Sequence, residues 1–160
     1  MDLQTVAQQA TDLLLKERLT ISLAESCTGG MIAAALVGCP GVSEALLEGC
    51  VCYSNEAKQR TLGVLTETLQ NHGAVSAECA LEMVHGICDY TNSDTAAAVT
   101  GIAGPGGGTE FKPVGTVYIA VQVCGKARVE HHVFSGDRTA VRTQTAVRAL
   151  EMLMDGIKSR

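Results

Sequence analysis

The amino-acid sequence predicts a layered α/β domain with a mixed sheet. Segments with helical periodicity and short apolar runs follow one another in the order helix, strand, helix, strand, helix, helix, strand, hairpin, helix. The chain of 160 residues fits a single domain, 1–160, that is large enough to bury a core. Aromatic residues are scarce, with no Trp, three Tyr and two Phe, so small apolar residues are expected to fill a core between closely packed layers.

The first third of the chain predicts two helices and two strands. Apolar residues recur at helical spacing over residues 2–17, which indicates an amphipathic helix. A short apolar run over 20–24 indicates a strand. The small residues of Gly29–Val37 predict a helix, which the Gly and Pro residues that follow would end. A second strand is expected over 46–53.

Capping residues indicate where the middle helices begin and end. Asn55 is expected to cap one helix and Gly63 to end it, and Thr66 and Ser76 are two further expected caps. The second of these opens a helix over 77–90, on which one apolar stripe is formed by Ala80, Met83, Val84 and Ile87.

The last third of the chain predicts a buried strand, a hairpin and a long helix. The apolar run over 96–100 ends in a glycine-rich loop, which is typical of a buried strand. Strands over 115–123 and 127–134 flank a turn at Cys124-Gly125-Lys126. Asp137 is expected to cap the last helix, whose inward face would comprise Ala140, Val147, Leu150 and Met154.

Charge and cysteine content exclude several classes of protein. The net charge is −5 and the pI is near 5.3, which argues against direct binding to nucleic acid but leaves room for a local anion pocket. The longest apolar run, 31–37, is too short to span a membrane, and the N-terminus does not resemble a signal peptide, so we expect a cytoplasmic protein without membrane contact. The seven cysteines form no C-x-x-C pair, so neither a disulfide framework nor a structural metal site is expected.

The first of three candidate loops at strand ends is Glu25-Ser26-Cys27-Thr28-Gly29-Gly30. A glycine-containing turn from strand to helix brings backbone N–H groups together, and these can bind an anion or the oxyanion of an acyl-transfer intermediate. Ser26 or Cys27 would be well placed there as a nucleophile. The alternative is that Ser26 or Thr28 only caps the helix and that Cys27 is a small buried hydrophobe.

The second loop runs from Tyr53 to Lys58 and offers a base for the serine. The four histidines show neither ligand spacing nor a dyad pattern, so a desolvated lysine is the better candidate. Lys58 would lie near the start of a helix, whose positive end favours a neutral amine. The Tyr53 phenol could relay a proton between Ser26 and Lys58. Alternatively, Lys58 is a solvated helix residue and Tyr53 a half-buried strand residue.

The third loop is a candidate phosphate site. It runs from Thr100 to Pro105 and continues into three glycines, whose N–H groups can approach an anion. Its spacing matches neither the P-loop nor the dinucleotide-binding motif. Arg138 follows a Gly-Asp turn and could pair with a phosphate, or it could be an exposed arginine near a helix start.

Six stretches occur in one order along the chain and together resemble a known family: AESCTGG, YSNEAK, GAVS, TGIAGPGGG, KPVGTVY and GDR. They closely resemble the carboxy-terminal domain of the CinA family (competence/damage-inducible protein A) over about residues 5–155. The resemblance implies a three-layer α/β/α sandwich that is often dimeric or a higher homo-oligomer. It also implies hydrolysis of the amide of nicotinamide mononucleotide to nicotinate mononucleotide and ammonia, with neither metal nor other cofactor.

Residue by residue, the resemblance places the family's nucleophilic serine on Ser26 and its tyrosine and lysine on Tyr53 and Lys58. Backbone N–H groups around Cys27–Gly30 would hold the oxyanion, and Thr100 departs mildly from a Ser common in relatives. The substrate-binding residues that it implies are Glu25, Cys27, Thr28, Gly29, Gly30, Asn55, Thr100, Gly101, Ala103, Gly104 and Arg138.

Three other functions stay open on the sequence. The pocket could bind a nucleotide without catalysis, because fold does not fix function. The chain could hydrolyse a different amide. It could also be an interaction partner in DNA uptake or repair, although its acidic balance and few aromatic residues argue against contact with nucleic acid itself.

Overall fold

The computed structural model describes residues 1–160 and contains one five-stranded mixed sheet in the order β2-β1-β3-β4-β5. The first three strands in this order are parallel, and β4 and β5 run antiparallel to their neighbours. The strands are β1 (Ile21–Glu25), β2 (Leu46–Val51), β3 (Thr95–Gly101), β4 (Thr116–Val123) and β5 (Lys126–Val133). The predicted mixed sheet is confirmed.

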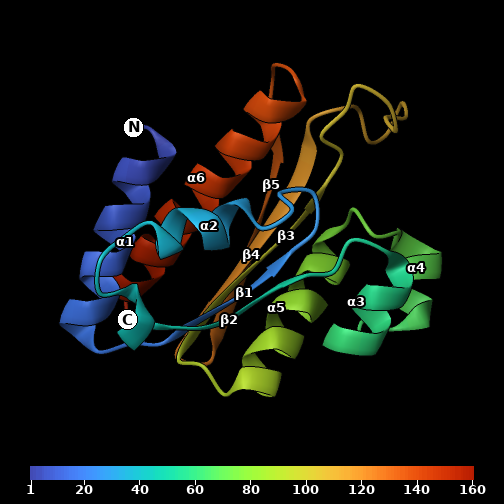
Figure 1. Ribbon diagram of the computed structural model, residues 1–160. Helices are drawn as coiled ribbons and strands as arrows, with labels where there is room; N and C mark the ends of the chain where they lie inside the picture. Colours follow the sequence, from blue (N-terminus) through green and yellow to red (C-terminus); the bar gives the residue numbers. More distant parts are fainter.

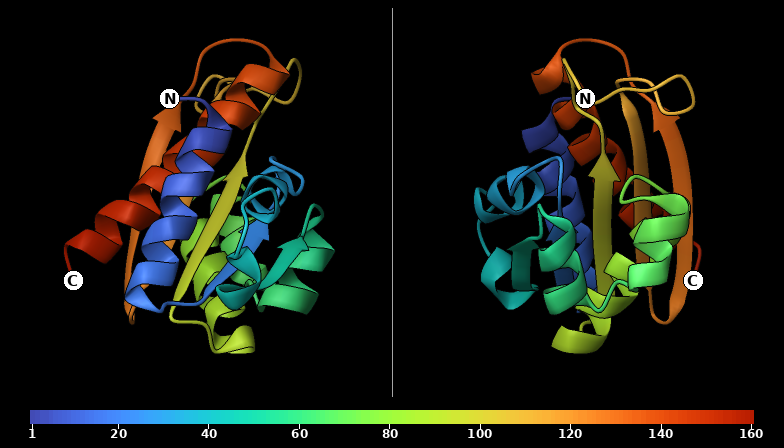
Figure 2. Two further views of the ribbon diagram at one scale, coloured as in Figure 1. Left: turned by 60° about the vertical axis from the view of Figure 1, so that its left-hand side comes forward. Right: turned by 90° about the vertical axis from the view of Figure 1, so that its right-hand side faces the viewer.

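Helices cover both faces of this sheet, so the predicted three-layer α/β/α sandwich is also confirmed (Figures 1 and 2). One layer comprises α1 (Leu3–Glu17), α2 (Met31–Val37) and α6 (Arg138–Lys158). The other comprises α3 (Asn55–Leu62), α4 (Thr66–His72) and α5 (Ala77–Thr91), and a short 3₁₀ turn spans Val42–Glu44. Three helices therefore connect β2 to β3, where the predicted order has two. None of the helices combines the length and the apolar composition that a membrane span requires.

The core consists of two clusters, one on each face of the sheet, because successive strand residues point to opposite faces. Leu23 and Ala97 pack with α1, α2 and α6, whereas Ala24 and Ala98 pack with α5. Small side chains on β3 let α5 lie close to the sheet, as the scarcity of aromatic residues predicts.

Three predicted boundaries are wrong. Asn55 is the first residue of α3 and not its N-cap, because the hydroxyl of Ser54 accepts from the N–H of Ala57 at 3.1 Å. Similarly, Thr66 lies inside α4 and Leu65 holds the N-cap position. Helix α2 begins at Met31 and not at residue 29, since Gly29 and Gly30 have φ of 59° and 94°, outside the helical region.

Other boundaries are confirmed or differ slightly. Ser76 and Asp137 cap α5 and α6 through their side chains, and Gly63 ends α3 with φ of 71°. The hairpin turn is shorter than predicted, because Lys126 already belongs to β5. On α6, Leu150 and Met154 are buried as expected, but Ala140 and Val147 are only half-buried.

Candidate active site

The structure brings Ser26 and Lys58 into contact, although 32 positions separate them along the chain. Ser26 directly follows β1, and Lys58 lies on the next helix after β2, the strand beside β1. The Lys58 Nζ lies 3.0 Å from the Ser26 Oγ, and both side chains are buried, with exposed fractions of 1% for Lys58 and 7% for Ser26. A serine hydroxyl and a buried amine therefore meet at the carboxyl ends of two parallel strands, where open α/β sheets bind ligands.

Lys58 Nζ has two further partners, which are the main-chain carbonyl oxygens of Cys52 at 2.9 Å and Tyr53 at 3.1 Å. No carboxylate contacts it, and burial lowers the pKa of the Lys58 amine below its usual value of 10.5. In its neutral state the amine would have two N–H bonds for the two carbonyl oxygens and one lone pair for the Ser26 hydroxyl. This arrangement suits a general base for Ser26.

The turn after Ser26 presents backbone donors. The N–H groups of Cys27, Thr28 and Gly30 form no hydrogen bond within the protein, while the N–H of Gly29 donates to the Ser26 carbonyl at 3.0 Å. The positive φ of Gly29 and Gly30 gives this turn its shape. Three unpaired N–H groups next to a candidate nucleophile are the donors that an oxyanion requires.

The Glu25 carboxylate stabilises this turn through three hydrogen bonds. It accepts from the Thr28 hydroxyl at 2.6 Å and from the N–H groups of Ile32 at 3.0 Å and Ala33 at 3.0 Å. Glu25 and Thr28 are both buried, with exposed fractions of 1% and 0%. The Glu25 carboxylate therefore orients the loop, and the substrate-binding role that the resemblance implies for Glu25 stays a prediction.

Cys27 is buried beside Ser26, and its main-chain carbonyl is bound from another element. Burial raises the pKa of the Cys27 thiol to about 11, so at neutral pH it is almost entirely the weakly nucleophilic thiol. The guanidinium of Arg142 donates to the carbonyls of Cys27 at 3.1 Å and Thr28 at 2.8 Å. Sequence reasoning missed Arg142. The available signal was its spacing of four from Arg138, which puts both arginines on one face of α6.

Arg138 connects the second and third candidate loops. Its guanidinium donates to the Gly104 carbonyl at 2.8 Å and to the Tyr53 phenol at 3.0 Å. The phenol forms no hydrogen bond to Ser26 or Lys58, and only the Tyr53 carbonyl contacts the amine. A proton relay through the phenol therefore stays a prediction.

The third loop uses its side chains for packing. The Thr100 hydroxyl donates to the Ala74 carbonyl at 2.8 Å, and Ala103 is buried in the core. A Cβ on Gly101 would lie 2.7 Å from Val117, and one on Gly104 would lie 2.4 Å from Val114. The loop can bind a ligand through its main chain. The N–H groups of Ala103, Gly104 and Gly106–Gly108 form no hydrogen bond within the protein and are free to donate. Asn55 is exposed, and its side chain forms none either.

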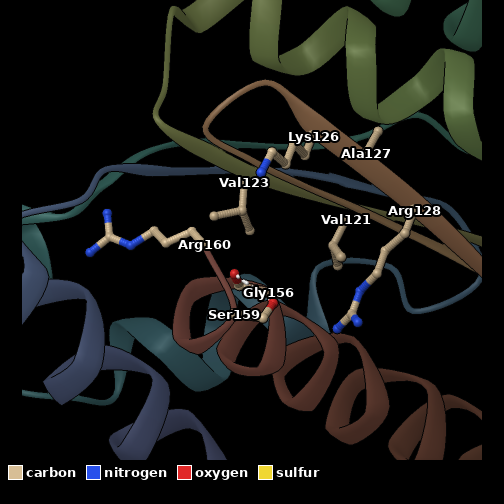
Figure 3. A pocket seen from close by; sticks show the side chains of 8 residues that line it. All are labelled: Val121, Val123, Lys126, Ala127, Arg128, Gly156, Ser159 and Arg160. Carbon is tan, nitrogen blue, oxygen red and sulfur yellow. Dashed lines mark hydrogen bonds between the residues drawn. The ribbon is translucent and has the colours of Figure 1, made fainter.

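A separate hollow of about 110 Å³ lies between the β4–β5 hairpin and the end of α6 (Figure 3). Figure 3 shows Val121 and Val123 above Gly156 of α6 and above Ser159, which follows that helix. The hairpin lies at the end of the sheet where β3 begins, because Val123 pairs with Thr95. Ser26 lies at the opposite end, so this hollow is separate from the candidate active site.

No group of three or more His, Cys, Asp or Glu side chains is arranged to hold a metal ion.

The chain is similar to known proteins over nearly its whole length. The family model described as the CinA C-terminal domain matches residues 3–157. A competence-damage inducible protein of Clostridium beijerinckii is 54% identical over 141 residues, which cover 88% of this chain and 34% of that protein. A CinA-like protein of Kosmotoga olearia is 47% identical over 150 residues, which cover 94% and 36%. The chain thus spans about a third of the length of these relatives.

Solved structures agree with the fold. The competence/damage inducible protein CihA of Agrobacterium tumefaciens has a TM-score of 0.95 and 42% identity, covering 99% of this chain and 96% of that one. A CinA superfamily protein of Klebsiella pneumoniae has a TM-score of 0.96 and 34% identity and covers 100% of both chains.

Proposed function

This chain belongs to the CinA C-terminal domain family, and we propose that it hydrolyses the carboxamide of nicotinamide mononucleotide to nicotinate mononucleotide and ammonia. The observation that carries the proposal is the buried contact between the Lys58 Nζ and the Ser26 Oγ, at 3.0 Å, beside unpaired backbone N–H groups. A nucleophile, a base and an oxyanion site are the parts that hydrolysis of an amide through an acyl-enzyme requires.

In the proposed mechanism, neutral Lys58 accepts the hydroxyl proton of Ser26 while Oγ attacks the carboxamide carbon. The negative charge that forms on the carbonyl oxygen is held by N–H groups of the 27–30 turn. The Lys58 ammonium then protonates the amide nitrogen, and collapse of the tetrahedral intermediate breaks the C–N bond and releases ammonia. A water molecule, deprotonated by the same amine, then attacks the acyl-enzyme. The carboxylate product is released, and the Ser26 oxygen recovers its proton from the Lys58 ammonium.

Local charge supports a substrate that carries a phosphate. The chain has a net charge of −5, but two cationic side chains, those of Arg138 and Arg142, lie around the 26–30 turn and the loops beside it. Neither arginine forms an ion pair with a carboxylate. Together with the free N–H groups of residues 103–108, they favour binding of an anion.

The test measures ammonia and nicotinate mononucleotide released from nicotinamide mononucleotide by the wild-type protein, Ser26→Ala and Cys27→Ala. We expect Ser26→Ala to lower kcat by ~10³-fold or more. Cys27→Ala should stay within about threefold of wild type, because its thiol has a pKa of about 11 and is protonated at neutral pH. Cys27→Ala is the matched control, since it alters the adjacent side chain of the same turn.

Each contrary result has a distinct meaning. Wild-type activity in Ser26→Ala would exclude Ser26 as the nucleophile. Activity of the wild-type protein on nicotinamide or nicotinamide riboside, but not on the mononucleotide, would keep the amidase and change its substrate. Binding of the mononucleotide without turnover would favour a binding module with a silent site.

A further inference from the structure

Arg142 contacts the backbone of the candidate oxyanion turn from a different layer of the structure. It lies on α6, 115 positions after Cys27, and its Nε and Nη2 donate to the carbonyls of Cys27 at 3.1 Å and Thr28 at 2.8 Å. These carbonyls belong to two successive peptide groups. The side chain forms no ion pair, so its guanidinium is committed to the backbone of this turn.

The opposite end of the first of these peptide groups is the N–H of Thr28. This N–H forms no hydrogen bond, whereas the N–H of the next peptide group, that of Gly29, is occupied by the Ser26 carbonyl at 3.0 Å. A cation bound to the carbonyl oxygen polarises the peptide group and strengthens its N–H as a donor. The guanidinium and an oxyanion would thus bind the two ends of one peptide group.

The turn also needs an external restraint to keep its shape. Gly29 and Gly30 have φ of 59° and 94°, and glycine adopts several backbone conformations at similar cost. No side chain caps α2 at Gly30. Glu25 accepts from the Thr28 side chain and from two N–H groups of α2, but it forms no hydrogen bond to the Cys27–Thr28 peptide group itself. Arg142 is the side chain that bonds to this peptide group itself.

We propose that Arg142 is a positioning residue that orients and polarises the Cys27–Thr28 peptide group, so that the N–H of Thr28 donates to the oxyanion formed on attack by Ser26. This inference rests on the proposed amidase function for its kinetic consequence. It does not place Arg142 in contact with the substrate. It distinguishes Arg142 from Arg138, which bonds to the Tyr53 phenol and the Gly104 carbonyl.

The kinetic test compares wild type, Arg142→Met and Arg142→Lys. Loss of an oxyanion donor lowers kcat by ~10²-fold, so we expect that loss in Arg142→Met with KM within about threefold of wild type. Arg142→Lys should recover about tenfold of this loss, because one ammonium can still bind one of the two carbonyls. A raised KM with unchanged kcat in Arg142→Met would overturn the proposal, since it would indicate that the arginine binds substrate. Wild-type kinetics would also overturn it.

The matched control is Arg148→Met, which removes an arginine from the same helix. Arg148 pairs with Glu130 at 2.8 Å and Glu151 at 3.2 Å and contacts no residue of the turn. We expect Arg148→Met to lower thermal stability without lowering kcat. An equal loss of kcat in both variants would overturn the proposal, because the effect would then be one of helix stability.

A crystal structure of Arg142→Met tests the inference separately from the proposed reaction. We expect the Cys27–Thr28 peptide group to change orientation or to become disordered while Glu25 still bonds to α2. An unchanged peptide group in this variant would overturn the positioning role, whether or not the wild-type protein hydrolyses nicotinamide mononucleotide. If the wild-type protein releases no ammonia but the peptide moves, the proposed function fails and the positioning role stands.

Discussion

At the scale of single residues, the protonation state of Lys58 determines whether it can act as a base. Burial lowers the pKa of its amine below 10.5, and only the neutral amine can accept the Ser26 proton. We therefore expect kcat/KM to rise with pH through the lowered pKa and then to reach a plateau below 10.5. Lys58→Arg should abolish turnover but retain substrate binding, because a guanidinium stays charged. Turnover by Lys58→Arg would remove the lysine from the mechanism.

The same pKa makes stability depend on pH. Between the lowered pKa of the folded state and the usual value of 10.5, the amine is neutral when folded and charged when unfolded. The unfolded state then binds more protons, so the free energy of unfolding rises with pH across this window. Below the window the amine is charged in both states, and the folded protein bears the full free-energy cost of burying that charge. Urea unfolding of wild type and Lys58→Met over this window measures the effect. A rise of equal size in both proteins would assign it to another group.

At the scale of elements, Glu25 links the end of β1 to the start of α2. It accepts from the N–H groups of Ile32 and Ala33 at 3.0 Å each, in a helix whose own N-cap, Gly30, has no side chain. Glu25→Ala leaves these buried donors unpaired, and we expect it to lower the free energy of unfolding by about 2 kcal/mol. The melting temperature should fall by about 4–8 °C. Glu56→Ala, an exposed acid in the first turn of α3, is the control and should change little.

The contact between α3 and α5 sets the position of Lys58. A Cβ on Gly86 of α5 would lie 1.9 Å from the carbonyl oxygen of Leu62, the last residue of α3. Gly86→Ala must therefore push α3 away, with a loss of about 3 kcal/mol in the free energy of unfolding and a lower kcat. Chemical unfolding and steady-state kinetics measure both. Gly106→Ala, where a Cβ has no neighbour within 4 Å, should keep its stability; equal destabilisation of both variants would contradict this reason.

At the scale of the whole molecule, local signals in the sequence predict much of the fold and part of the site. Periodicity and caps such as Ser76 and Asp137 depend on neighbouring residues, so they can be read from a single chain. A choice between adjacent polar residues, as with Ser54 and Asn55, depends on backbone geometry that the sequence does not show. The contact of Arg142 with Cys27 spans 115 positions and exists only because α6 packs beside the end of β1. Such contacts require the tertiary structure.

The distribution of charge over the molecule leads to a prediction about substrates. Around the candidate site, Arg138 and Arg142 present positive charge in a chain whose net charge is −5. A substrate with a phosphate is attracted to this local charge, whereas a riboside lacks the phosphate and carries only the positive charge of its pyridinium ring. We expect kcat/KM for nicotinamide mononucleotide to exceed that for nicotinamide riboside by about tenfold or more at low salt, the value of one charge-assisted hydrogen bond.

Salt and a substitution separate this attraction from other contributions. Added NaCl screens exposed charges over about 10 Å at 0.1 M, so it should lower kcat/KM for the mononucleotide but not for the riboside, whose only charge is the positive one of its pyridinium ring. Arg138→Met should reduce the preference for the mononucleotide. Any loosening of the loops that Arg138 joins, through Tyr53 and Gly104, would affect both substrates, so the ratio of their kcat/KM values isolates the phosphate. An equal salt dependence for the two substrates would mean that this positive region does not bind the phosphate, and that the guanidinium of Arg138 serves only to hold the two loops together.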